Sequence, residues 1–299
     1  TLMANSTTGI QDDIIARSVI QGFTANIAPM AALNTIFSDA ASNRGDRVSV
    51  PRLASALDAA ADKAVGGAYT IQDIDSDAVE IILNKHKYVS MGADDIEVAN
   101  SSALALERYG VRKGNLLAKT VVQDVFSEIT AANFGGAAFT GAASTFDEDD
   151  VADIAGVCDD ADMPADDRYL VLSNAYITAL RKVAAIKDTS GYGFNAIQSG
   201  NIPMLQGFKI IPSNIIPGNG ENLVGFATDG SGIASAFRYL APQDGNKYDR
   251  AEPVVGEGGI TLGLRNWYSE DFGNQRSVME CVYGYETGLA AGIKRLVSA

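Results

Sequence analysis

The sequence is poor in the residues that most often build reactive or disulfide-stabilised sites. Its 299 residues include one tryptophan, two cysteines and a single histidine, His86. Cys158 and Cys281 are far apart and form no Cys-x-x-Cys pair, so we expect two reduced thiols. These residues cannot supply the usual ligand set of a zinc site. Any Ser-His-Asp or Cys-His mechanism would need His86, which lies between Lys85 and Lys87 and is predicted to be a surface histidine.

Long apolar runs and positive charge are also scarce. No run approaches the roughly 18 residues of a membrane span, and the start has no charged region followed by an apolar one, so we expect neither a membrane segment nor a secretion signal. There are 23 Lys and Arg against 37 Asp and Glu, a formal net charge of -14. Such a surface repels phosphates unless a local basic patch exists, which argues against nucleic acid as a direct ligand.

The remaining composition is that of a folded protein. Apolar residues make up 46% and charged residues 20% of the chain, close to ordinary globular usage, with 30 glycines and 8 prolines. A compact chain of this length buries roughly three quarters of its unfolded surface, so a sizeable core is expected. The reduced cysteines suit synthesis in a reducing cytoplasm.

Carboxylates are abundant, but their spacing does not form a convincing metal site. Asp73, Asp75 and Asp77 begin like a calcium-binding loop. The match then fails, because Ala78 occupies the position that needs glycine and Asn84 the position that needs glutamate. We therefore assign no metal to this segment.

Two further acidic segments, 147–150 and 159–162, flank a predicted helix at 151–161. The helix macrodipole favours negative charge at a first turn, so we interpret these residues as solvated charge, with weak adventitious cation binding as the alternative. The glycine-rich segments 230–232 and 256–259 lack the remaining residues of a phosphate-binding loop. We expect no catalytic, cofactor-binding or metal-binding residue, and no enzyme activity.

The order of predicted elements indicates an α+β protein with its helices clustered in the middle of the chain. Helices are predicted at 10–23, 101–133, 151–161 and 173–185, the last capped by Ser173. Strands are predicted at 47–53, 69–71, 78–83, 86–91, 169–172, 223–227, 233–240, 253–255, 261–267, 278–284 and 292–297. In the helix at 101–133, Gly110 and Gly114 are expected to permit a bend near its start.

Two segments are predicted to lack a core of their own. Residues 10–23 form one amphipathic helix, which cannot cover its own apolar face, so residues 1–46 are predicted to be an arm that packs on something else. The β-rich runs between residues 47 and 91 are predicted to form a long hairpin that needs partners to be stable.

One segment has the most specific pattern in the chain. A strand at 169–172, a helix at 173–185 and a glycine-rich loop lead into Gly207-Phe208-Lys209-Ile210-Ile211-Pro212-Ser213-Asn214. With the order of the other parts, this resembles major capsid proteins of tailed double-stranded DNA phages, which have the Hong Kong 97 phage fold. The resemblance covers essentially the whole chain.

The resemblance implies five parts. They are an N-terminal arm (1–46), an extended β-hairpin called the E-loop (47–100), a peripheral domain with a long spine helix (101–145), an axial domain (146–242) and return strands of the peripheral domain (243–299). The burial that the arm and hairpin lack would then come from neighbouring copies.

The implied function is that of a major capsid protein that self-assembles into hexamers and pentamers of an icosahedral phage head. Its location would be the virion, after synthesis in the host bacterial cytoplasm. Its partners would be copies of itself, a portal protein, and scaffolding or decoration proteins, with DNA packaged inside without specific binding.

Some family members cross-link a hairpin lysine to a neighbour, and Lys63 lies in the right part of the chain for this role. The alternative is a solvated lysine near the loop tip. Two functional alternatives remain: a metal-binding α+β enzyme, and another non-enzymatic wall or sheath protein.

Overall fold

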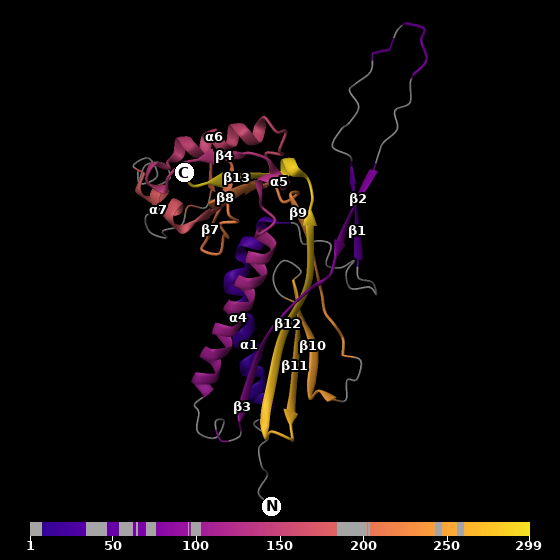
Figure 1. Cartoon of the computed structure of the whole chain (residues 1–299), viewed down its shortest axis with the longest axis vertical. Helices are drawn as coiled ribbons and strands as arrows, with labels where there is room; N and C mark the ends of the chain where they lie inside the picture. Colours follow the sequence, from indigo (N-terminus) through magenta and orange to yellow (C-terminus); the bar gives the residue numbers. More distant parts are fainter. Residues whose placement is uncertain are drawn as a thin grey trace, which may run out of the picture.

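The computed structural model describes residues 8–33, 47–53, 62–63, 65–69, 76–94, 96, 103–183, 202, 204–242, 247–255 and 260–299. Two regions form the body of the molecule (Figure 1). In the view of Figure 1, an upper region combines a sheet with short helices, and an elongated lower region places two long helices beside a second sheet. The mixed α+β class predicted from the sequence is confirmed.

The helices and strands follow the predicted order. The helices are α1 (Thr8–Ile27), α4 (Ala103–Phe126), α5 (Ala131–Phe134), α6 (Glu148–Asp159) and α7 (Asn174–Lys182), with 3-10 turns η1 (Ala28–Ala32), η2 (Ala143–Thr145) and η5 (Ala290–Gly292). The strands are β1 (Arg47–Leu53), β2 (Ser76–Ile82), β3 (Lys85–Asp94), β4 (Ala137–Thr140), β5 (Tyr169–Ser173), β6 (Met204–Leu205), β7 (Phe208–Ser213), β8 (Leu223–Thr228), β9 (Ile233–Arg238), β10 (Arg250–Val255), β11 (Thr261–Ser269), β12 (Asn274–Thr287) and β13 (Ile293–Val297).

The lower sheet is built around the long strand β12. Its strand order is β10-β11-β12-β3, and the C-terminal half of β12 also pairs with β9. All of these pairings are antiparallel. The segment 86–91, predicted to belong to the hairpin, instead lies in β3 and pairs with β12, so the described hairpin consists of β1 and β2 alone. Alternating polarity identified the strand but not its partner, because pairing is decided by residues far away in sequence.

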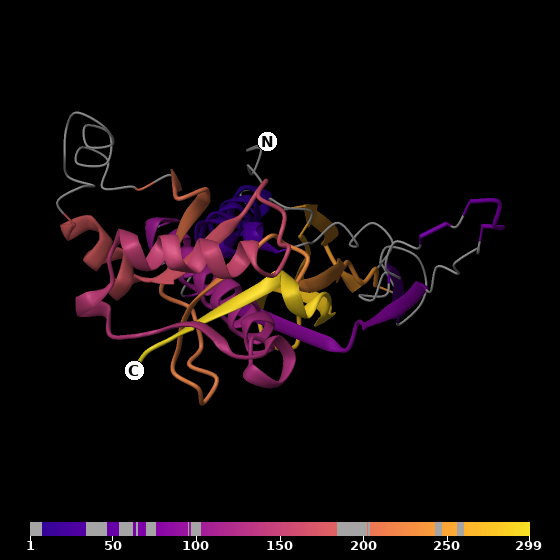
Figure 2. The same ribbon diagram turned by 90° about the horizontal axis from the view of Figure 1, so that it is seen from above.

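The upper sheet has the order β4-β13-β8-β5-β7-β6. Strands β5 and β7 are parallel neighbours, and α7 follows β5 along the chain. Figure 1 and Figure 2 show that α6 and α7 both lie beside this sheet. Their apolar faces bury Ile154, Tyr176 and Leu180 against Leu170 and Phe208 of the sheet.

The N-terminal helix is part of the body, contrary to the prediction that it packs on something else. Val19, Phe23 and Ile27 are buried in the main core of the same chain. The helices α1 and α4 approach closely at two glycines: a Cβ on Gly114 would lie 2.0 Å from the Val19 carbonyl oxygen, and one on Gly22 would lie 2.1 Å from that of Val111. These glycines therefore allow the contact between the two helices.

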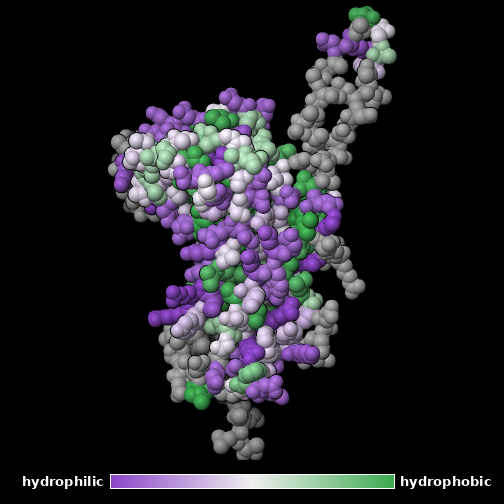
Figure 3. Space-filling view, in the orientation of Figure 1, coloured by the Kyte–Doolittle hydropathy of each residue, from purple (hydrophilic) through white to green (hydrophobic). Residues whose placement is uncertain are grey.

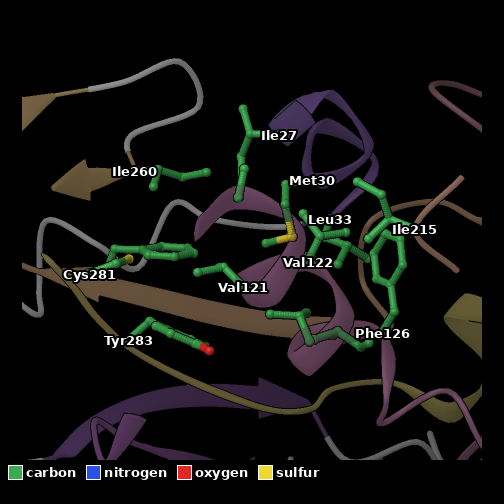
Figure 4. Close-up of a cluster of buried hydrophobic side chains, with 14 of the residues drawn as sticks. Ile27, Met30, Leu33, Val121, Val122, Phe126, Ile215, Ile260, Cys281 and Tyr283 are labelled. Atoms are coloured by element: carbon green, nitrogen blue, oxygen red, sulfur yellow. The ribbon is translucent and has the colours of Figure 1, made fainter. Parts of the chain in front are cut away.

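The main core continues from the helices to both sheets. Figure 4 shows residues of η1 and α4 beside residues of the lower sheet, with Ile215 next to Phe126. An apolar stripe along α4 and just beyond its end is buried: Leu117, Val121, Val122, Val125, Phe126 and Ile129. One contiguous core therefore joins the two regions.

The helix predicted to reach residue 133 ends at Phe126. Beyond it the chain turns and begins the short α5. The side-chain amide of Asn219 donates to the carbonyl oxygens of Phe126 and Ile129, at 2.9 Å each. These bonds hold the turn that follows α4, where the Phe126 carbonyl also accepts a bond from the Ile129 N–H at 3.1 Å.

The two predicted helix starts differ in their capping. Asp147 forms a capping box with Asp150, since each side chain accepts a bond from the other residue's backbone N–H. This confirms the acidic start of α6. Ser173 stands at the N-cap of α7, but its side chain makes no capping hydrogen bond there, and the helix ends at Lys182 before the predicted residue 185.

The strand predicted at 69–71 is not seen in the described residues. Tyr69 lies outside any strand, and the next two residues are outside the described part.

Candidate functional site

The single histidine lies in an ion-pair cluster of the lower sheet. His86 Nε2 lies 3.0 Å from Glu280 Oε2, and Arg265 Nη2 lies 2.6 Å from Glu280 Oε1. The Glu280 side chain is almost fully buried, whereas that of His86 is about half exposed. A buried carboxylate needs such partners, so this cluster has a sufficient structural explanation. The prediction of a surface histidine is confirmed.

Both cysteines are free and completely buried. Burial raises the pKa of Cys158, and it raises that of Cys281 further. The thiol, not the reactive thiolate, is therefore the stable form of each. The prediction of two reduced thiols agrees with this geometry.

The acidic residues at 147–150 and 159–162 lie at the two ends of α6. Asp147 and Asp150 form the cap of α6, and Asp159 lies 2.7 Å from Nη1 of the buried Arg168. Within the described ranges, no group of three His, Cys, Asp or Glu side chains could hold a metal ion. Asp73 and Asp75 of the calcium-like segment lie outside those ranges.

The glycine-rich segment 230–232 forms the turn between β8 and β9. Asp229 Oδ1 accepts hydrogen bonds from the Ser231 N–H at 2.9 Å and the Ser231 hydroxyl at 2.7 Å. A Cβ on Gly232 would lie 2.4 Å from the Ile293 side chain. The lack of space for a side chain explains the glycine at position 232. The Asp229 carboxylate accepts hydrogen bonds in this turn, whereas a bound phosphate would need hydrogen-bond donors there. The segment 256–259 is not described.

A hollow of about 660 Å³ lies between η2 and α7. It is lined by Ala143, Ser144, Thr145, Phe146, Asp147, Ala175, Thr178, Ala179, Lys182 and Val183. Of its polar groups, Asp147 caps α6, while the hydroxyls of Thr145 and Thr178 donate to the backbone. These bonds tie three of its polar side chains to the neighbouring backbone.

The clearest candidate for function is the β1–β2 hairpin, whose base is built into the body. Val48, Val50, Ile81 and Leu83 form a small core with Ala234 and Ala236 of β9. The backbone of the hairpin also approaches β12 closely, since a Cβ on Gly284 would lie 2.2 Å from the Ile82 carbonyl oxygen. The base is therefore held in place by its own chain.

The far end of this hairpin projects away from the body (Figure 1). Val65 is fully exposed, and Tyr69 is 79% exposed. The Lys63 ammonium lies 3.8 Å from the centroid of the Tyr69 ring, and Gly66 has a positive φ of 82° that favours glycine. The tip thus presents two apolar side chains and one cation to solvent, and Lys63 is exposed near the loop tip, in agreement with the solvated-lysine alternative.

Comparison with known proteins gives the fold. No family model and no curated protein matches the sequence. Among solved structures, a chain of Mycobacterium phage Che8 is similar over 89% of both chains, with a TM-score of 0.61 and 20% identity. A chain of the capsid of the Cyanophage P-SCSP1u aligns with 89% of this chain and 86% of its own, with a TM-score of 0.64 and 16% identity. The chain has the fold of phage capsid proteins.

The same fold extends beyond phages. A virus-like particle from Pyrococcus furiosus is similar over 95% of this chain and 98% of its own, with a TM-score of 0.55 and 13% identity. These matches confirm the resemblance at the level of the fold. Among the described helices, none combines the length and hydropathy required to cross a membrane.

Proposed function

We propose that this protein is the structural subunit of an icosahedral phage head, built from hexamers and pentamers of the chain. The observation that carries the proposal is a hairpin with a buried base and an exposed apolar tip on a phage-capsid fold. Apolar side chains held away from the body of their own chain are suited to contact a neighbouring copy. Many repeated contacts would make assembly cooperative.

In this proposal the described elements take the roles that the family resemblance implies. The β1–β2 hairpin and its tip belong to the E-loop, within residues 47–100. The helix α4 is the spine helix of the peripheral domain, which includes the lower sheet. The upper sheet with α6 and α7 is the axial domain, based on residues 146–242 apart from β9 and joined by β4 and β13.

The proposed location is the virion, after synthesis in the host bacterial cytoplasm. The proposed partners are other copies of this chain, a portal protein, and scaffolding or decoration proteins. DNA would be enclosed without sequence-specific binding. The subunit would have a structural role and no catalytic one.

Assembly of the purified protein tests this function. We expect closed symmetric shells by electron microscopy and a fast-sedimenting species in solution. The double variant Val65→Ser and Tyr69→Ser should raise the protein concentration needed for assembly about tenfold or more, because burying each side chain is worth about 1.5–3 kcal/mol.

The matched control is Val65→Ile with Tyr69→Phe, which keeps both side chains apolar and should assemble as the wild type does. A wild-type protein that stays a small monomer under all assembly conditions would contradict the function. Unchanged assembly of the serine variant would contradict the role of the tip.

A further inference from the structure

One face of α4 has a charge opposite to that of the chain as a whole. The net charge is -14, yet the segment from Arg108 to Gln123 contains four cations and no carboxylate. The cations are Arg108, Arg112, Lys113 and Lys119. A local field of this sign attracts anions even on an acidic protein.

The four cations share the solvent-facing side of the helix. Arg108, Arg112 and Lys119 lie at spacings of four and seven residues, which places them along one line of an α-helix. Lys113 lies on the other side of the exposed Tyr109 and Leu116, and the buried stripe of α4 faces the opposite direction. Figure 3 shows hydrophilic residues along the α4 side of the lower region, with hydrophobic ones among them.

The described residues supply no ion-pair partner for these cations. In the described part of the chain, none of the four has a hydrogen bond or an ion-pair partner. The nearby acidic residue Asp124 already accepts a bond from the Tyr283 hydroxyl at 2.7 Å and lies 3.8 Å from the Lys87 ammonium. Glu107 precedes the segment at its N-terminal end. The described contacts therefore leave the positive charge of this face available to a partner.

We infer that this face of α4 binds the phosphate backbone of DNA, without sequence specificity, and that it forms part of the inner surface of the shell. The inference rests on the proposed function, which encloses DNA. The cations extend over about 16 Å of helix, at 1.5 Å per residue, which suits a polyanion with closely spaced charges. Long, unpaired Lys and Arg side chains position a phosphate backbone but do not read bases.

The binding is weak and strongly salt-dependent. Four phosphate contacts give a slope of about -3.6 for log K against log salt, and about a hundredfold loss of affinity between 50 and 200 mM salt. The negative charge of the remaining surface opposes tighter binding. Such contacts would bind the enclosed DNA along the inner surface of the shell without immobilising it.

The test measures the anisotropy of a labelled short DNA duplex with full-length, unassembled subunits over a range of salt concentrations. The variant Arg108→Gln, Arg112→Gln, Lys113→Gln, Lys119→Gln should lose at least about tenfold in affinity at low salt and most of the salt slope. The matched control, Arg181→Gln, Lys182→Gln, Lys247→Gln, Lys294→Gln, changes the net charge equally and should keep the slope. Equal losses in both variants, or wild-type binding by the α4 variant, would overturn the inference.

Electron microscopy of the same proteins separates this inference from the proposed function. Wild-type shells whose subunits show no α4-dependent DNA binding would defeat the inference alone, whereas absence of wild-type shells would defeat the function. An α4 variant that binds DNA normally but forms no shells would identify the face as a contact between subunits, against the inference.

Chemical labelling tests the inward orientation. A lysine reagent too large to cross the shell should modify Lys113 and Lys119 in disrupted shells but not in intact ones. Lysine 63 at the hairpin tip provides an internal comparison in the same digest. Equal labelling of Lys113 and Lys119 in intact and disrupted shells would place the face outside and overturn the inference.

Discussion

The N-terminal helix and the β1–β2 hairpin are both predicted from the sequence to need a partner, but they lie in different environments in the structure. Both carry apolar residues without a core of their own. In the structure, Val19 and Phe23 of α1 are buried against the same chain, whereas Val65 and Tyr69 of the hairpin are exposed. An apolar stripe therefore predicts that a surface will be buried, but it does not identify the chain that buries it.

The difference depends on a close fit that one segment has and the other lacks. The helix α1 meets α4 where glycines let the backbones touch, at Gly22 and Gly114. The hairpin has a comparable fit at its base, where Gly284 lets β12 approach Ile82, while its tip has no such contact among the described residues. The hairpin is thus anchored to the body at one end and free for a partner at the other.

The largest expected effect comes from breaking the fit of α1. The change Gly114→Ala places a Cβ 2.0 Å from the Val19 carbonyl oxygen and 2.8 Å from the Phe23 nitrogen. Backbone atoms cannot rotate away, so the two helices must separate. We expect the free energy of unfolding to fall by about 3 kcal/mol or more, measured by denaturant unfolding of unassembled subunits.

The control for this change is Gly156→Ala in α6. It makes the same substitution in an exposed helical position with open space around the new Cβ. Alanine is the better helix former, so stability should rise by about 0.5–1 kcal/mol. If Gly114→Ala behaved as the control does, α1 would not be packed on α4 in solution, and the difference between the two segments would disappear.

A smaller effect is expected at the contact that joins α4 to the lower sheet. The Tyr283 hydroxyl is buried and donates to Asp124, and burial, reinforced by this bond, raises the pKa of Tyr283 far above its ordinary value. The folded protein keeps the proton while an unfolded chain loses it above about pH 10. This contribution is therefore complete below that pH and is lost as the pH rises, by about 1.4 kcal/mol per pH unit.

The variant Tyr283→Phe should cost about 1 kcal/mol at neutral pH and should flatten the loss of stability above pH 10. Unfolding free energies at neutral and alkaline pH measure both changes. The variant Tyr88→Phe, at an exposed position, controls for the loss of a phenol elsewhere. An alkaline dependence that is identical in wild type and Tyr283→Phe would show that this hydroxyl is not protected by the fold.

Local patterns in the sequence predicted most elements, and contacts distant in sequence explain two of the failures. The buried stripe of α4 follows from its period, and the acidic cap of α6 from residues that are adjacent in the chain. The end of α4 depends on Asn219, far along the sequence, and the pairing of β3 depends on β12. No period in the sequence encodes either partner.

Of the two candidate surfaces, the hairpin tip was expected from the sequence and the positive face of α4 was not. The family resemblance led us to expect Lys63 near a loop tip, and Lys63 is exposed there. The positive face of α4 was missed because the overall charge was considered before its distribution. Its signal was available in the stretch from Arg108 to Gln123, which has four cations and no carboxylate.

The smallest effect is expected at the hairpin tip. The double variant Val65→Ser and Tyr69→Ser should change the free energy of unfolding of unassembled subunits by less than about 0.5 kcal/mol, because neither side chain is buried in its own chain. At the base, by contrast, Ile81 is fully buried, and Ile81→Ala should cost about 2–4 kcal/mol in the same measurement. A loss above 1 kcal/mol for the tip variant would mean that the tip packs on its own subunit, as α1 does, and that its apolar side chains are not reserved for a neighbour.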